Sequence, residues 1–147
     1  MGHSYSNVLL HIVFSTKNRR KIIPPLHQEQ LWKYITGIVH NLDGSVLAIG
    51  GMPDHTHILL AQPGTIGFST MIQKIKANSS GWMEETVKDF EWQEGFGAFS
   101  VSDSRRADVI AYIRNQEEHH KKRSFEQEFI ALLKAHNVDY DPRYVFG

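Results

Sequence analysis

The residues of this sequence whose type and spacing most favour a chemical role are two histidines separated by one residue, His55 and His57. If they lie on a β-strand, their side chains point to the same face, because strand side chains alternate. The apolar run 58–61 that follows them predicts such a strand. Two imidazoles on a rigid element suit a divalent metal ion that keeps open positions for a substrate. A His-x-His pair alone is weak evidence, and a second pattern supports it.

That second pattern is Tyr112 followed four residues later by Gln116, in a segment that we expect to be helical from about 105 to 122. Residues four apart share a helix face, while Ile110 and Ile113 lie to the other side and can anchor the helix. A phenol can act as a nucleophile, and an amide oxygen can ligate a hard metal ion. Each residue taken singly also fits a purely structural role, as packing or as solvated helix surface.

The elements that must position these residues follow from hydrophobic patterning and turn signals. We expect strands over 8–15, 45–50, 55–61 and 98–102. Helices are expected after Pro24-Pro25, after Pro63-Gly64 and from about 105, the last capped by Ser102 or Ser104. A final amphipathic helix carries an apolar stripe made by Phe125, Phe129, Leu132 and Leu133.

The resulting order β-α-β-β-α-β predicts an α+β, ferredoxin-like fold. In this fold an antiparallel sheet has helices on one face, and here C-terminal helices that carry the tyrosine are added. The second sheet face needs a ligand, a partner or extra helices, and the two histidines would work there.

The bulk composition favours one soluble domain over 1–147. The 147 residues include no cysteine, which excludes disulfides and thiolate metal sites and fits a cytoplasmic location. No apolar run approaches the length of a membrane span, and no secretory signal is evident, so no membrane partner is expected. Sixteen basic and sixteen acidic residues cancel, which argues against indiscriminate coating of nucleic acid.

Four blocks of the chain, in order, resemble the single-tyrosine transposases of the insertion sequence 200/605 group. They are residues 11–19, 52–60 with the His-x-His pair, 92–102, and 112–120 followed by Phe125 and Glu128. The resemblance implies a protein that cuts and rejoins single-stranded DNA through a 5′-phosphotyrosine. It implies Tyr112 as the catalytic nucleophile and His55, His57 and Gln116 as ligands of a divalent metal ion.

The resemblance also implies partners: single-stranded DNA with hairpin ends, and a second copy of the chain in a homodimer whose active site is shared between subunits. Two histidines and one amide give the metal site no ligand charge, so we expect Mn²⁺ activity beside Mg²⁺ in the cell. Phosphate contacts are expected from basic side chains, although such runs are often only solvated surface. These side chains are Arg19, Arg20, Lys21, Lys74, Lys76, Arg105 and Arg106.

Two positions depart from the family pattern. Thr56 stands between the histidines, where a bulky aliphatic residue is usual, and should face the helix-covered side of the sheet. Asp54 stands where asparagine is frequent, and could tighten metal binding or cap the turn. Two alternatives to a strand transferase stay open: a non-catalytic nucleic-acid-binding module on the same fold, and a metal-dependent hydrolase in which Tyr112 is structural.

Overall fold

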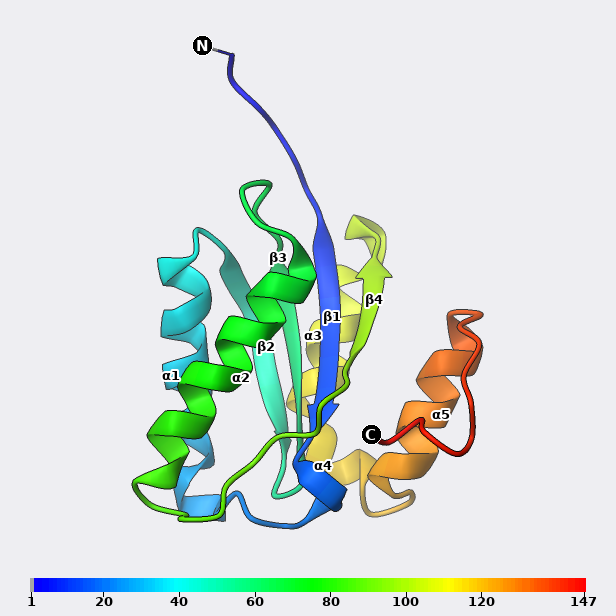
Figure 1. Ribbon diagram of the computed structural model, residues 1–147. Helices are drawn as coiled ribbons and strands as arrows, with labels where there is room; N and C mark the ends of the chain where they lie inside the picture. Colours follow the sequence, from blue (N-terminus) through cyan, green and yellow to red (C-terminus); the bar gives the residue numbers. More distant parts are fainter. Residues whose placement is uncertain (1) are drawn as a thin grey trace.

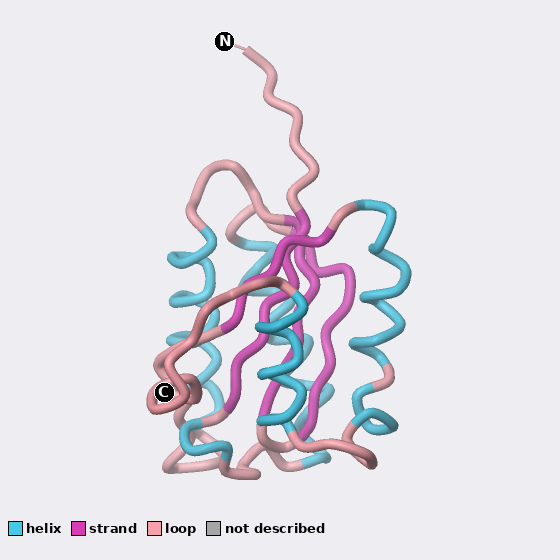
Figure 2. The backbone as a smooth tube through the Cα atoms, turned by 90° about the vertical axis from the view of Figure 1, so that its right-hand side faces the viewer, coloured by secondary structure: helices cyan, strands magenta, loops and turns pink. Residues whose placement is uncertain are grey.

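A four-stranded antiparallel sheet lies between helices on both of its faces (Figures 1 and 2). The structure is a computed structural model and describes residues 2–147. The strands are β1 (Leu9–Ser15), β2 (Ser45–Met52), β3 (His55–Ala61) and β4 (Gly97–Val101). The α-helices are α1 (Gln28–Asn41), α2 (Phe68–Glu84), α3 (Arg106–Arg114), α4 (Gln116–His119) and α5 (Phe125–Ala135). Short 3-10 turns η1 (Lys17–Arg19), η2 (Pro25–His27) and η3 (Asp103–Arg105) complete the elements.

The strand order is β2-β3-β1-β4, and every neighbouring pair is antiparallel. This order and the element sequence confirm the predicted ferredoxin-like sheet. β3, which carries the two histidines, is therefore an inner strand with partners on both sides. An inner strand is a rigid support for side chains that must hold fixed positions.

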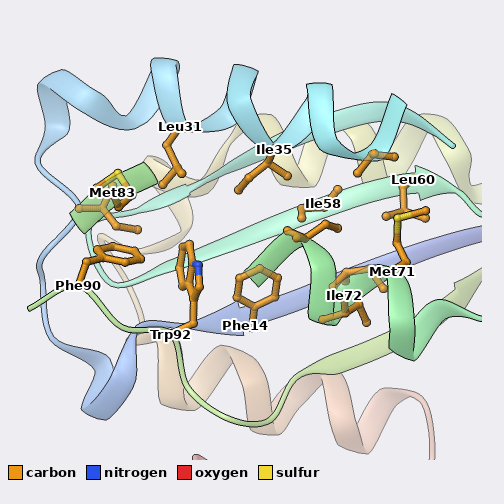
Figure 3. Close-up of a cluster of buried hydrophobic side chains, with 14 residues drawn as sticks. Phe14, Leu31, Ile35, Ile58, Leu60, Met71, Ile72, Met83, Phe90 and Trp92 are labelled. Carbon is orange, nitrogen blue, oxygen red and sulfur yellow. The ribbon is translucent and has the colours of Figure 1, made fainter. Parts of the chain in front are cut away.

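The main hydrophobic core lies between the sheet and helices α1 and α2 (Figure 3). Alternate residues of β1 and β3, including Phe14, Ile58 and Leu60, point into it. The helix side chains that are buried there are Leu31, Ile35, Val39, Met71, Ile72 and Ile75. Thr56 has the same strand parity as Ile58 and is fully buried, with its hydroxyl donating to the Gly50 carbonyl at 3.1 Å.

Helices α3, α4 and α5 lie over the other sheet face, the face that receives the histidines. Ile113 of α3 packs against Leu59, while Phe125 and Phe129 of α5 pack against Val13 and Phe99. These apolar contacts hold both helices beside the two imidazoles. Among residues 2–147, no helix combines the length and the apolar character that a membrane crossing requires.

The predicted helix from about 105 to 122 is wrong in one respect, because it is broken at Asn115. The Asn115 N–H donates to the Tyr112 carbonyl at 3.2 Å, and its φ of −109° and ψ of 30° end α3. The chain resumes as the short α4, which turns Gln116 into the interior. The predicted serine caps are also absent, since the hydroxyls of Ser102 and Ser104 face each other at 3.1 Å.

Candidate active site

The two histidines of β3 lie side by side, as strand alternation predicts. Both are fully buried, and their ring centroids are 5.1 Å apart. The strand register sets Val13 of β1 and Gly50 of β2 opposite His57. The same register brings His11 of β1 diagonally beside His57, and the His11 Nε2 and His57 Nδ1 atoms are 2.8 Å apart.

Close packing of α3 on β2 places the tyrosine beside this pair. A β-carbon built on Gly50 would lie 2.6 Å from the carbonyl oxygen of Ile113, so the backbone of α3 approaches β2 as only glycine permits. One residue before Ile113, the Tyr112 ring lies 5.8 Å from the His57 ring, centroid to centroid. The His119 ring also stacks on the Tyr112 ring, with the centroids 4.4 Å apart. The nucleophile candidate and the metal-ligand candidates therefore meet within one chain.

Glu128 of α5 joins the tyrosine to the histidines. Its Oε1 lies 2.8 Å from His57 Nε2 and 3.2 Å from His120 Nε2, while its Oε2 accepts the hydrogen bond of the Tyr112 hydroxyl. The carboxylate is fully buried on the apolar stripe of α5. A buried carboxylate needs several partners to offset its lost hydration, and here it has them all at the site.

The protonation pattern of the imidazoles shows what this cluster can hold. The His55 Nδ1–H donates to Asp54 at 2.6 Å, and the His120 Nδ1–H donates to the Arg123 carbonyl at 3.0 Å. A ring that carries only this Nδ1 proton has a lone pair on its Nε2 atom. Both Nε2 atoms face the Gln116 Oε1 at 3.0 Å, which is itself an acceptor. These atoms converge on a position that a cation would stabilise, either a metal ion or a second proton on His120, whose pKa Glu128 raises against the effect of burial.

The donor set fits a divalent metal ion. One donor atom each from His55, His57, His120 and Glu128 lies within 4.8 Å of the others, and Gln116 adds an amide oxygen. Imidazole, carboxylate and amide oxygen together suit Mn²⁺ and its neighbours, and the oxygens suit Mg²⁺. The carboxylate also supplies the ligand charge that the sequence-based set of His55, His57 and Gln116 lacks.

The electrostatics favour neutral imidazoles at His57 and His11 and an ionised carboxylate at Glu128. Burial lowers the pKa of His57 to about 4, against the effect of Glu128, and burial lowers the pKa of His11 to about 3. Although burial opposes it, hydrogen bonds from His120 and His57 hold the pKa of Glu128 far below its usual range. Burial and then Glu128 raise the pKa of Tyr112, so the phenol is neutral at pH 7.

Asp54 does more than stabilise the turn before β3, because it also binds the His55 ring. Its carboxylate accepts the His55 Nδ1–H, and this hydrogen bond outweighs burial and lowers the pKa of Asp54. A carboxylate behind a metal-ligating imidazole fixes the ring orientation and raises its basicity. His11 contacts the Nδ1 atom of His57, as Asp54 contacts the Nδ1 atom of His55.

The predicted DNA-contacting side chains are distributed over both layers. Arg105 and Arg106 are at the start of α3, on the site face, and pair with Asp108 at 3.6 Å and Asp103 at 2.7 Å. Lys74 and Lys76 belong to α2, on the opposite face, so the fold does not bring them to the site. The Lys76 ammonium donates to the carbonyls of residues 93, 94 and 95 at 2.9, 3.1 and 2.5 Å.

The basic loop after β1 is partly engaged within the chain. Arg19 lies over the Phe146 ring at 4.8 Å, with Glu126 at 3.8 Å, and Arg20 donates to the Asp89 carbonyl at 3.0 Å. Lys21 is exposed. This loop follows Ser15, the β1 residue opposite His55, so it leaves the sheet at the end where the histidines begin.

Comparison with known proteins decides the family. The family model described as "Transposase IS200 like" matches residues 4–116, which is most of the chain. The chain belongs to the IS200-like transposases. The matched span includes the His-x-His pair, Tyr112 and Gln116 of this IS200-like transposase, whereas His120 and Glu128 lie beyond it.

Two solved structures share the fold of this IS200-like transposase. One, described as a transposase from Deinococcus radiodurans R1, has a TM-score of 0.63 and 22% identity, over 79% of this chain and 96% of that one. The other, a REP-associated tyrosine transposase bound to a REP hairpin, has a TM-score of 0.63 and 18% identity, over 82% of this chain and 73% of that one. No curated protein matches the chain.

Three members of the cluster escaped the sequence reasoning as site residues: His11, His120 and Glu128. Glu128 left a usable signal, since it is a lone acid three residues after Phe125 on an otherwise apolar helix stripe. His11 left a weaker one, as a histidine in the apolar strand β1. His120 was visible only as a surface histidine near a helix end.

Proposed function

We propose that this transposase is a metal-dependent single-strand DNA strand transferase that cleaves and rejoins hairpin-bearing ends through a 5′-phosphotyrosine on Tyr112. The observation that carries the proposal is the double contact of Glu128. One of its oxygens holds the Tyr112 hydroxyl, and the other lies against His57 and His120. A nucleophile and a cation-binding cluster thus share one buried carboxylate.

The ligands that we propose for the ion are His55, His57 and Gln116, joined by His120 and Glu128, and the ion is Mg²⁺ or Mn²⁺. When bound, it supplies positive charge that polarises the scissile phosphate and offsets charge developing on it. The residues of the chain orient the other partner. The hydrogen bond to Glu128 fixes the direction of the Tyr112 hydroxyl, and the Arg123 guanidinium, 3.5 Å from that oxygen, favours a negative charge there.

The chemical step exchanges one phosphodiester bond for another. The bond from the Tyr112 oxygen to phosphorus forms as the bond from phosphorus to the 3′ oxygen breaks. The phenolic proton leaves toward Glu128, which already accepts its hydrogen bond, and the departing 3′ oxygen takes a proton from solvent. The phosphotyrosine preserves the bond energy, so a second 3′-hydroxyl can reverse the step and rejoin the strand.

The hairpin partner rests on the family and on the likeness to the REP-associated protein, which is bound to a REP hairpin. Backbone contacts are proposed from the exposed or half-buried basic residues that reach the site face or its edge: Arg19, Arg20, Lys21, Arg105 and Arg106. A homodimer with a shared site remains a prediction. The tyrosine already lies at the site of its own chain, which favours action within one subunit.

The deciding experiment uses single-stranded oligonucleotides that carry the palindromes flanking the coding sequence, with Mn²⁺. We expect a protein–DNA adduct that survives denaturation and is absent in Tyr112→Phe. Cleavage without an adduct would instead identify a hydrolase, and binding without cleavage a DNA-binding module. Mixing Tyr112→Phe with His57→Ala tests the shared site, because only a site built from two chains regains activity.

A further inference from the structure

A cavity of 660 Å³ opens beside Tyr112, and His11, the neighbour of His57, also lines it. It lies between α3, α5 and the end of β4, and its volume is within the range of about 300–1,000 Å³ typical of small-ligand sites. No step of the proposed reaction uses it. We propose that it holds one unstacked nucleotide of the single strand, the one joined to the scissile phosphate. The proposal rests on the proposed function for the identity of that phosphate.

The walls of the cavity suit a nucleobase. Small or apolar side chains from facing helices line it, with Val109 on α3 and Ala131, Leu132 and Ala135 on α5. The Tyr112 and His136 rings also line it, each backed by another ring: His119 at 4.4 Å and Phe99 at 4.6 Å, centroid to centroid. Bases bind to such surfaces by stacking and apolar contact, largely without regard to sequence.

The charges around the cavity suit the phosphates on either side of that base. Arg123 lines it next to the Tyr112 hydroxyl, and Arg105 lines it at the start of α3. Arg105 is partly balanced by Asp108, whereas the guanidinium of Arg123 is directed at the nucleophile. A phosphate within reach of both Arg123 and Tyr112 places its attached nucleotide at this cavity. A duplex cannot place a base in this cavity without flipping the base out of its stack, so the expected ligand is single-stranded.

The test measures base unstacking in a protein that cannot cleave. Tyr112→Phe, without added metal, is titrated with hairpin oligonucleotides carrying 2-aminopurine at successive single-strand positions. We expect fluorescence to rise at one position, where the base leaves its neighbours and enters the cavity. Ala131→Phe in the same background fills the cavity, and should remove the rise and weaken binding about tenfold, the loss typical of one stacked base.

Ala135→Phe is a second filling variant at an exposed position, and it guards against a folding defect in the first. Ala111→Phe adds the same ring on the exposed surface of α3 outside the cavity, and should leave the rise intact. The proposal is overturned if no position brightens, or if the rise persists in both filled variants. An adduct in wild-type protein with no brightening would leave the strand transferase standing and remove only the nucleotide pocket. A fluorescence rise without an adduct would support the nucleotide pocket and contradict the strand transferase.

Discussion

Replacing Gly50 by alanine should uncouple the tyrosine from its cluster without unfolding the protein. The new β-carbon would lie 2.6 Å from the Ile113 carbonyl oxygen, whereas ordinary contact begins at 3.4 Å, so α3 must retreat by about 0.8 Å. Tyr112 precedes Ile113 on that helix and moves with it. A misplacement near 1 Å costs about a hundredfold in rate when geometry sets the reaction.

The cost in stability should be smaller than the effect on rate. Overpacking of this kind costs about 1–3 kcal/mol, and domains of this size have about 5–15 kcal/mol to lose. We therefore expect Gly50→Ala to remain folded in urea titrations while adduct formation slows about a hundredfold in single-turnover assays.

Gly37→Ala is the matched control, because a β-carbon at Gly37 on α1 meets nothing within 4 Å. That variant should gain about 0.5–1 kcal/mol from helix propensity and keep its rate. A folded Gly50→Ala protein that forms the adduct within threefold of the wild-type rate would refute the claim that the α3–β2 approach sets the position of the nucleophile.

Three further outcomes follow from the same site. His57→Ala should abolish cleavage and leave hairpin binding largely intact; equal loss of both would contradict its role as a ligand. Glu128→Gln keeps the shape of the side chain but removes its charge. It should weaken Mn²⁺ binding about 10- to 100-fold in a calorimetric titration. Unchanged Mn²⁺ binding would contradict the role of Glu128 as a ligand. Without metal, stability should fall as pH drops from 6.5 toward 4, because the unfolded state protonates His11 and His57 while the folded state keeps both neutral, with pKa values of about 3 and 4. Urea titrations in a chelator check this, and His11→Asn should flatten the slope; a steeper slope would contradict the assignment.

Strand alternation was sufficient to predict that His55 and His57 share one face, because an inner strand has little freedom to depart from its period. The helix pattern around Tyr112 was less informative. Residues 114–124 contain no proline or glycine that would mark a break, and no apolar side chain that would show which face of the helix is buried. The break at Asn115 is visible only in the structure, where Ile113 and Gln116 are both buried. The apolar stripe of α5 marks Glu128 as unusual, but its role could not be assigned from local sequence, because its partners come from β3, α3 and the residues after α4.

The cluster is divided between β3 and the residues after Asn115, and this division links ion binding to the docking of α4 and α5. Gln116, His120 and Glu128 reach the histidines only when α4 and α5 are in place. An ion that prefers the assembled cluster must, by linkage, favour the docked arrangement of these helices. If the cluster binds an ion as proposed, the packing of residues 116–147 on the sheet depends on the ion concentration, while the sheet keeps its own hydrophobic core.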